Sequence, residues 1–275
     1  MFSYIYGKSN ITFAGILQEQ ASIPMTDKSY VIYAGPLDES LLDTQKVTFN
    51  TINQYSFCLA QEDIEFKNAL QQSDVLLPDG ISIVHLVRLL TGKKLKKIAG
   101  YDLHNFFLAH YNETGGSCFY LGSSQNTLDK IEKRVRSEYP SLRVGGYSPP
   151  YKTEFSDEDN LKMIKAVSDF KPDVLFIGMT APKQEKWANK FKNELDVKKI
   201  CSIGAVFDFF AGTVKRPSQF WINLGLEWLF RLSKEPRRMW RRYLYYGPKF
   251  VFQILKGKIA PTTFILKSGE IKHVS

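Results

Sequence analysis

Residues 173–187 read DVLFIGMTAPKQEKW, and this stretch sets the pattern of the whole chain. Its first part, residues 173–178, is nearly continuous in large apolar residues, which is typical of a parallel strand covered on both faces. Pro182 then favours the first turn of a helix. A strand that passes through a short polar turn into a helix is half of a βαβ unit, so the stretch predicts an α/β fold.

Similar units recur along the chain. We expect a Rossmann-like, mostly parallel sheet flanked by helices, in which the first 46 residues are poorly assigned. The predicted strands are residues 30–34, 74–77, 117–121, 142–146, 173–178 and 199–206. The predicted helices are residues 55–71, 81–90, 102–111, 126–139, 157–170 and 183–195.

Length and composition restrict the class of protein. A chain of 275 residues with 44% hydrophobic residues suits one large α/β domain, with or without an appendage. It has no run of about 18 apolar residues and no signal-peptide shape, which predicts a cytoplasmic protein that does not span a membrane. The distant Cys58, Cys118 and Cys201 predict buried thiols in a reducing compartment. The four histidines lack metal-ligand spacing, so we expect no metal and no cofactor.

Positive charge is concentrated at the end of the chain. From Gly212 onward 13 Lys and Arg stand against 3 Glu, whereas the preceding 211 residues hold nearly equal numbers of acidic and basic groups. We therefore place a boundary near Ala211, between an α/β core (1–211) and a basic, aromatic appendage (212–275). This asymmetry predicts an anionic partner.

An arginine cluster in this appendage predicts a phosphate site. Arg238, Arg241 and Arg242 are spaced to share one helix face, and Arg231 precedes them. Such guanidinium groups can neutralise a diphosphate leaving group. Interleaved Trp and Tyr suit the headgroup region of an anionic membrane. An aromatic core with a solvated basic face, a nucleic-acid patch and an interface in a homo-oligomer are the alternatives.

Asp79 is the principal catalytic candidate. It follows the apolar run 75–77 and precedes Gly80, which places a carboxylate at the carboxyl end of a strand, where ligands bind in open α/β sheets. A carboxylate there can take the proton of an attacking hydroxyl. A helix N-cap is an equal alternative for the local sequence.

Other candidate contacts also have structural alternatives. Gly122 lies at a strand-to-helix turn that admits a phosphate or is simply tight. Lys183 and Gln184 can hydrogen-bond a sugar or phosphate, or form a solvated helix start. Asp208 lies among aromatic residues, so it contacts a ligand or forms an internal ion pair.

Two further motifs are weaker. Gly7-Lys8-Ser9 resembles the end of a phosphate-binding loop, although Phe2 replaces its first glycine, and an ordinary turn is the alternative. Residues 157–159 fit the Asp-Xaa-Asp pattern that holds a metal in many sugar transferases. Their place at a polar helix start favours a helix cap.

In combination these motifs resemble the WecG/TagA/CpsF family, glycosyltransferase family 26, from about residue 47 to residue 250. The motifs are specific when taken in order along the chain. They are TIN (51–53), LPDG (77–80), AGYDL (99–103), YLG (120–122), GYSPP (146–150), PKQE (182–185), GAVFD (204–208) and EPRRMWRRY (235–243).

The resemblance implies an inverting, metal-independent sugar transferase of surface polysaccharide biosynthesis. Its donor would be a UDP-sugar carrying N-acetylmannosamine, its uronate or glucose, and its acceptor a polyprenyl-diphosphate-linked sugar. The appendage would dock on the anionic inner face of the plasma membrane and complete the site, with no nucleic acid involved. The alternative is a catalytically inactive membrane-surface scaffold of the same fold.

The matching motifs also imply roles for single residues. Asp79 would be the general base, Thr51 would lie beside it, and Gln184 would position a sugar. Lys97 stands where the family usually has Arg, and Ile52 where it usually has Pro. The implied substrate-binding residues are Asn53, Lys97, Gly122, Lys183, Asp208, Arg231, Arg238 and Arg241.

Overall fold

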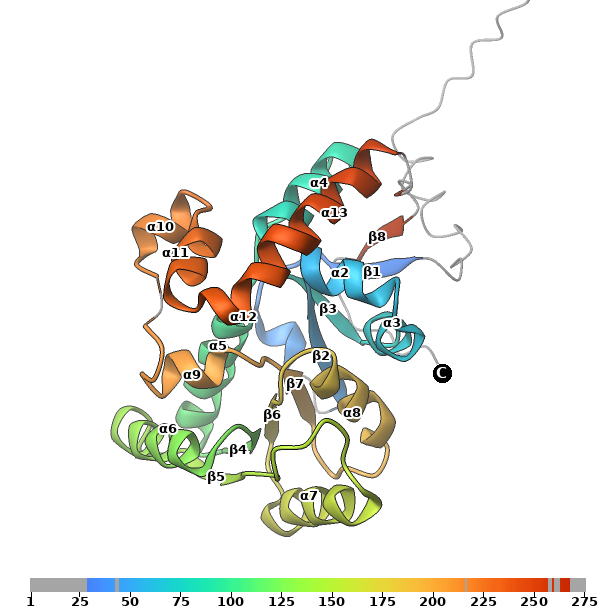
Figure 1. Ribbon diagram of the computed structural model, residues 1–275. Coiled ribbons are helices and arrows are strands. Elements are labelled where there is room, and N and C mark those ends of the chain that lie inside the picture. Colours follow the sequence, from blue (N-terminus) through green and yellow to red (C-terminus); the bar gives the residue numbers. More distant parts are fainter. Residues whose placement is uncertain (1–28, 43–44, 216, 257–258, 260–262, 268–275) are drawn as a thin grey trace, which may run out of the picture.

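The computed structural model describes residues 29–42, 45–215, 217–256, 259 and 263–267. Within them eight parallel strands form one sheet in the order β5-β4-β6-β7-β2-β3-β1-β8 (Figure 1), which confirms the predicted α/β class. The candidate turn at residues 7–9 lies outside the described residues. The strands are β1 (Tyr30–Tyr33), β2 (Val47–Ile52), β3 (Val75–Pro78), β4 (Ser117–Gly122), β5 (Arg143–Tyr147), β6 (Val174–Gly178), β7 (Lys199–Ser202) and β8 (Phe264–Lys267).

Helices connect the strands and cover both faces of the sheet (Figure 1). A short 3₁₀ turn, η2 (Glu39–Leu41), precedes β2, and a π-helical segment, η3 (Arg241–Tyr245), precedes the last helix. The α-helices are α2 (Gln54–Ala60), α3 (Ile64–Gln71), α4 (Ile81–Thr91), α5 (Gly100–Thr114), α6 (Gln125–Glu138), α7 (Asp157–Phe170), α8 (Lys183–Phe191), α9 (Val206–Phe210), α10 (Gln219–Asn223), α11 (Glu227–Lys234), α12 (Pro236–Trp240) and α13 (Tyr246–Leu255).

Alternate residues of the strands point into different parts of the core. Phe49, Tyr120 and Phe176 face one side and pack with α5, α6 and α9. On the other side, one cluster lies under α2, α3, α4 and α13 and a second under α7 and α8. Each fully buried side chain of this size stabilises the fold by roughly 1.5–3 kcal/mol. The three cysteines are buried free thiols, as predicted.

The structure corrects two predicted elements and adds two strands. The helix expected at residues 55–71 is two helices, because Asp63 caps α3 by accepting a hydrogen bond from the Phe66 N–H. The strand expected at residues 199–206 ends at Ser202, because Gly204 turns the chain with a positive φ and α9 follows. Strands β2 and β8 were not predicted. Strand β2 was missed because polar residues interrupt its apolar ones, and β8 was missed because it lies in the segment assigned to the appendage.

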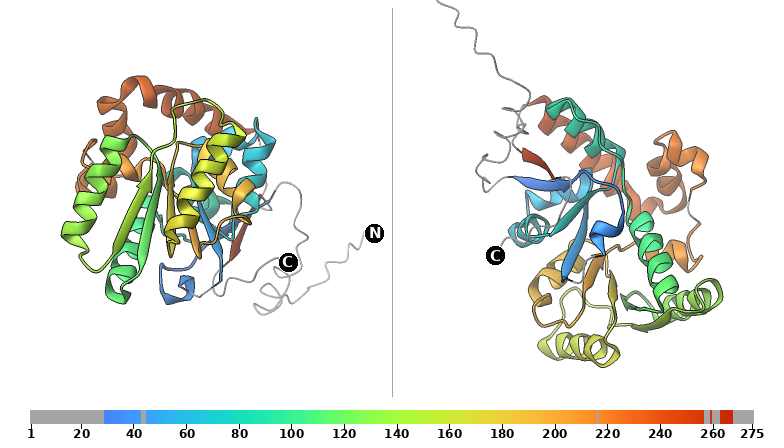
Figure 2. Two further views of the ribbon diagram at one scale, coloured as in Figure 1. Left: turned by 90° about the horizontal axis from the view of Figure 1, so that it is seen from below. Right: turned by 180° about the vertical axis from the view of Figure 1, so that it is seen from behind.

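The C-terminal segment returns to the sheet. Strand β8 pairs in parallel with β1, so that Phe264 lies opposite Tyr30. Tyr246 and Phe250 of α13 are buried in the cluster that includes α2 and α4, and α13 runs beside α4 in every view that shows both (Figures 1 and 2). The division of the chain at Ala211 into core and appendage stays a prediction. In the described ranges, no helix has both the length and the apolar character that crossing a membrane would require.

Candidate active site

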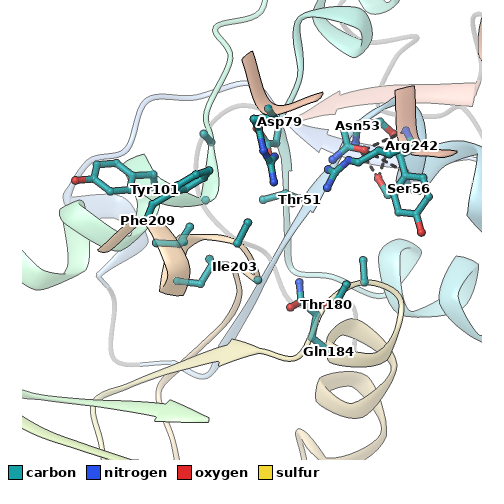
Figure 3. A pocket seen from close by; sticks show the side chains of 18 of the residues that line it. Thr51, Asn53, Ser56, Asp79, Tyr101, Thr180, Gln184, Ile203, Phe209 and Arg242 are labelled. Atoms are coloured by element: carbon teal, nitrogen blue, oxygen red, sulfur yellow. Dashed lines mark hydrogen bonds between the residues drawn. The ribbon is translucent and has the colours of Figure 1, made fainter. Parts of the chain in front are cut away.

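A polar pocket lies at the carboxyl ends of the central strands β3, β2, β7 and β6 (Figure 3). Thr51 is near the end of β2, and Asp79 directly follows β3. The strand register brings them together, because Ile52 pairs with Pro78 and the Asp79 N–H donates to the Ile52 carbonyl at 2.9 Å. The predicted site residues that line this pocket are Thr51, Asn53, Asp79, Gln184, Arg231 and Arg238.

The Asp79 carboxylate is not a helix cap. The N-cap of α4 is Gly80, and no side chain caps that helix. Gly80 has φ of +139°, and a Cβ there would lie 3.2 Å from the Cβ of Asn53, so the turn that presents Asp79 requires glycine. Among the described residues, the Asp79 side chain makes no hydrogen bond, which leaves both oxygens available to a ligand.

The surroundings of Asp79 raise its proton affinity. Burial raises the pKa of the Asp79 carboxyl and Glu227 acts in the same direction, whereas Lys97, Arg242 and Arg231 oppose the shift. A carboxylate whose pKa lies above its usual range is a stronger base than an exposed one. The carboxylate is therefore suited to accept a proton from a hydroxyl group.

Three arginines from the C-terminal helical segment also line this pocket: Arg231, Arg238 and Arg242. Arg231 is only 9% exposed, and its Nε makes no hydrogen bond within the described part of the chain. Burial lowers the pKa of Arg242, and the nearby Arg231 lowers it further. Figure 3 shows Arg242 reaching in from the same side as Asn53 and Ser56. A buried guanidinium group that is incompletely paired, like that of Arg231, favours binding of an anion, and a diphosphate can accept its hydrogen bonds.

A second pocket adjoins the first and shares Asp79, Arg231 and Arg242 with it. Lys97 lies here and forms an ion pair with Glu227 of α11 at 2.6 Å. Burial lowers the pKa of Lys97, but Asp79 and Glu227 outweigh that effect and the net pKa is raised. The ammonium group therefore stays charged beside the candidate base.

Gln184 lines the first pocket, and hydrogen bonds hold both ends of its amide group. Its side chain is 4% exposed, its Oε1 accepts from the Met179 N–H at 3.3 Å, and its Nε2 donates to Oε1 of Glu185 at 2.9 Å. The preceding turn contains Thr180 with φ of +74°, a left-handed conformation that is uncommon for a β-branched residue. Such strain concentrates at functional sites.

Four predicted site residues line neither pocket: Gly122, Lys183, Asp208 and Arg241. Lys183 donates to the Lys152 carbonyl and lies 3.6 Å above the Phe155 ring. Asp208 forms an ion pair with Arg238 at 3.4 Å, which is the structural alternative considered for it. A Cβ on Gly122 would lie 2.5 Å from the Gly178 carbonyl oxygen, so close approach of two strands explains that glycine.

Arg241 is exposed, and its neighbour Arg242 takes the place expected for it. The acidic residues 157–159 begin α7, where Ser156 and Asp159 form a capping box. The helix-cap interpretation of that motif is thus confirmed.

The pocket also contains residues that were not proposed from the sequence: Tyr101, Thr180, Glu185 and Glu227. Burial of Glu185 could have been predicted from the sequence. It stands three residues before the apolar Ala188, so the two residues share the buried face of α8. No such signal existed for Glu227, since its partner Lys97 is 130 residues away.

Comparison with known proteins shows the family to which the chain belongs. The model of the glycosyl transferase WecG/TagA/CpsF family matches residues 21–263. The chain is 29% identical over 248 residues to the N-acetylglucosaminyldiphosphoundecaprenol N-acetyl-beta-D-mannosaminyltransferase of Bacillus subtilis (strain 168), covering 90% of this chain and 94% of that protein. It is 30% identical over 236 residues to the protein of the same name from Bacillus spizizenii (strain ATCC 23059 / NRRL B-14472 / W23), covering 85% and 89%. The chain therefore belongs to the WecG/TagA/CpsF family of glycosyl transferases.

Proposed function

We propose that this chain transfers a sugar from a UDP-sugar to a polyprenyl-diphosphate-linked sugar, with inversion and without a metal. The observation that carries the proposal is that an Asp79 carboxylate without a hydrogen bond shares a pocket with Arg231 and Arg242, at the carboxyl edge of the sheet. The names of the two relatives support the acceptor class and favour N-acetylmannosamine as the sugar.

In this mechanism Asp79 takes the proton of an acceptor hydroxyl. The hydroxyl oxygen forms a bond to the anomeric carbon while the bond from that carbon to the diphosphate oxygen breaks. Arg231 and Arg242 stabilise the negative charge that develops on the departing diphosphate. Hydrogen-bond donors that already point at the site of developing charge make the largest single contribution to rate acceleration in many enzymes.

Entry of a nucleotide sugar requires part of the site to open. The free volume of the first pocket is about 100 Å³, whereas ligand sites commonly offer roughly 300–1,000 Å³. Three residues that line the pocket, Glu227, Arg231 and Arg238, come from α11 and α12. We infer that these helices shift outward when the donor binds and close again over it.

The C-terminal helices also suit a membrane surface. Ten of the 15 exposed large hydrophobic side chains of the described residues lie between residues 220 and 255, among them Trp228, Trp240 and Leu255. The same segment is strongly basic. Apolar side chains with interspersed cations bind anionic headgroups. We infer that α10 to α13 dock on the cytoplasmic face of the membrane that holds the acceptor.

An apolar groove between α4 and α13 is a candidate binding site for the lipid part of the acceptor. It has a volume of about 420 Å³ and shares Gln54, Ser82, Trp228 and Tyr243 with the second pocket, so it adjoins the pocket that Asp79 lines. Its apolar wall consists of Leu86, Leu89, Trp228, Pro248, Phe250, Val251 and Ile254. We infer that the polyprenyl chain lies in this groove while its diphosphate reaches the arginines.

The test of the proposed function is UDP release from a panel of UDP-sugars. The acceptor is a polyprenyl-diphosphate-linked sugar in anionic vesicles, and EDTA is present throughout. We expect release that depends on the acceptor and persists in EDTA, with the fastest donor identifying the sugar. Vesicle binding without release from any donor would instead support an inactive scaffold.

The groove predicts a selective loss of acceptor use. Leu89→Asp and Val251→Asp place a charge where the lipid would lie, and we expect each to raise KM for the acceptor by about 10-fold or more, since a buried uncompensated charge costs over 1.4 kcal/mol. Donor binding should be unchanged. Leu161→Asp on α7, whose exposure lies between those of Leu89 and Val251 and which does not line the groove, is the matched control. Equal acceptor KM values in all three variants would refute the assignment.

A further inference from the structure

Glu185 is a buried acid at the edge of the site that the mechanism above does not use. It lies in the first turn of α8, lines the first pocket and is 2% exposed. Its Oε1 accepts the hydrogen bond from Gln184 Nε2, while its Oε2 makes no hydrogen bond among the described residues. An ionised carboxylate so placed would be strongly destabilising, since a buried charge needs a partner or several hydrogen bonds.

The charged groups around Glu185 do not compensate such a charge. Arg242 stabilises the carboxylate only through space. On α8 itself Lys183 turns to the Phe155 ring, and Lys186 is ion-paired with Asp63 and Glu65 beside α3. Burial therefore raises the pKa of Glu185 to about 7, and an anion bound in the pocket would raise it further by repulsion.

We propose that Glu185 acts as a neutral carboxylic acid, which orients the Gln184 amide and offers its own Oε2 hydroxyl to a sugar oxygen. The hydrogen bonds then run in one direction. The Met179 N–H donates to Gln184 Oε1, Gln184 Nε2 donates to Glu185 Oε1, and the Oε2 hydroxyl donates to the ligand. No proton is transferred along this chain. The identity of the ligand as a sugar rests on the proposed function.

The proposal distinguishes three substitutions. Glu185→Gln keeps an acceptor for Gln184 and a donor for the ligand, so it should hold kcat/KM within a few-fold of the wild type. Glu185→Ala removes both groups, and Glu185→Asp is one methylene too short to reach them. We expect losses of about 10²-fold for these two, the size that a misplaced positioning group produces.

The pH profile supplies a readout that a purely structural role would not change. The functional form of Glu185 is protonated, so its contribution is complete below its pKa and is lost as the pH rises through that value. The wild type should lose kcat/KM above neutral pH, and Glu185→Gln should not. Melting temperatures of all variants establish that they are folded.

Two results would overturn the proposal. One is Glu185→Gln being as impaired as Glu185→Ala, which would mean that the charged form is needed. The other is Glu185→Ala having wild-type kcat/KM and pH profile.

Infrared difference spectra measure the protonation of Glu185 directly, independently of the proposed function. A carboxylic-acid carbonyl band near neutral pH that Glu185→Gln removes and Asp79→Asn retains would support the neutral acid even if no donor were turned over, and its absence would contradict it.

Discussion

Asp79→Asn is expected to lower kcat for sugar transfer by about 10²–10⁴-fold, the usual contribution of a positioned general base. Asparagine has the same shape but cannot accept the proton. The wild-type carboxylate makes no hydrogen bond among the described residues, so the substitution breaks none of the contacts that hold the pocket. UDP affinity and melting temperature should therefore stay near those of the wild type. Single-turnover kinetics with acceptor in vesicles measure the effect.

The matched control for this variant is Asp169→Asn, an exposed acid on α7 whose side chain pairs with Lys165. The wild-type pH profile gives a second check. Because the raised pKa of Asp79 must be exceeded for the base to be ionised, kcat should fall as the pH drops through a value above the usual aspartate range. Turnover by Asp79→Asn at the wild-type rate would exclude Asp79 as the base.

Arg242→Ala is expected to reduce kcat by about 10²–10³-fold, as does the loss of one preorganised donor in other enzymes. Arg242 lines both pockets and lies near Arg231 and Asp79. Arg242→Lys should recover only part of the loss, because an ammonium group cannot bind a diphosphate bidentately. Steady-state kinetics with the best donor measure all three enzymes.

Arg241→Ala is the control that the chain itself provides. Arg241 is adjacent in sequence, carries the same charge and is exposed outside both pockets. It should reduce vesicle binding at most, with little effect on kcat once the enzyme is saturated with membrane. Equal losses of kcat in the two variants would show that the cluster acts only through its net charge.

Much of the fold was predictable because parallel strands buried on both faces have long apolar runs. The position of Asp79 followed from the same logic, since it directly succeeds such a run. Strand β2 lacked this signal, because Thr48 and Asn50 point polar groups into contacts with Asp74 and Ser73. The choice between Arg241 and Arg242 was not predictable either. The π-helical segment that starts at Arg241 is wider than an α-helix and changes which side chains share a face.

The long-range contacts of the site had no local signature at all. The ion pair between Lys97 and Glu227 joins residues that only the complete fold brings together. Likewise, Glu185 gains its unusual proton affinity from burial, which depends on everything packed around α8. Sequence patterns identify which residues have suitable chemistry, but the desolvation that tunes them is a property of the assembled pocket.

Strand β8 has a consequence for how the site is covered. The chain leaves the sheet after β7, passes through the helices that supply the pocket arginines, and is fixed again beside β1. These helices thus form a bridge with two anchored ends and not a free arm. Because both ends are held by the sheet, these helices stay near the pocket even when they tilt, which keeps the local concentration of their arginines high. Removing β8 would also leave one edge of β1 without a paired strand, and such an exposed edge can pair with another chain.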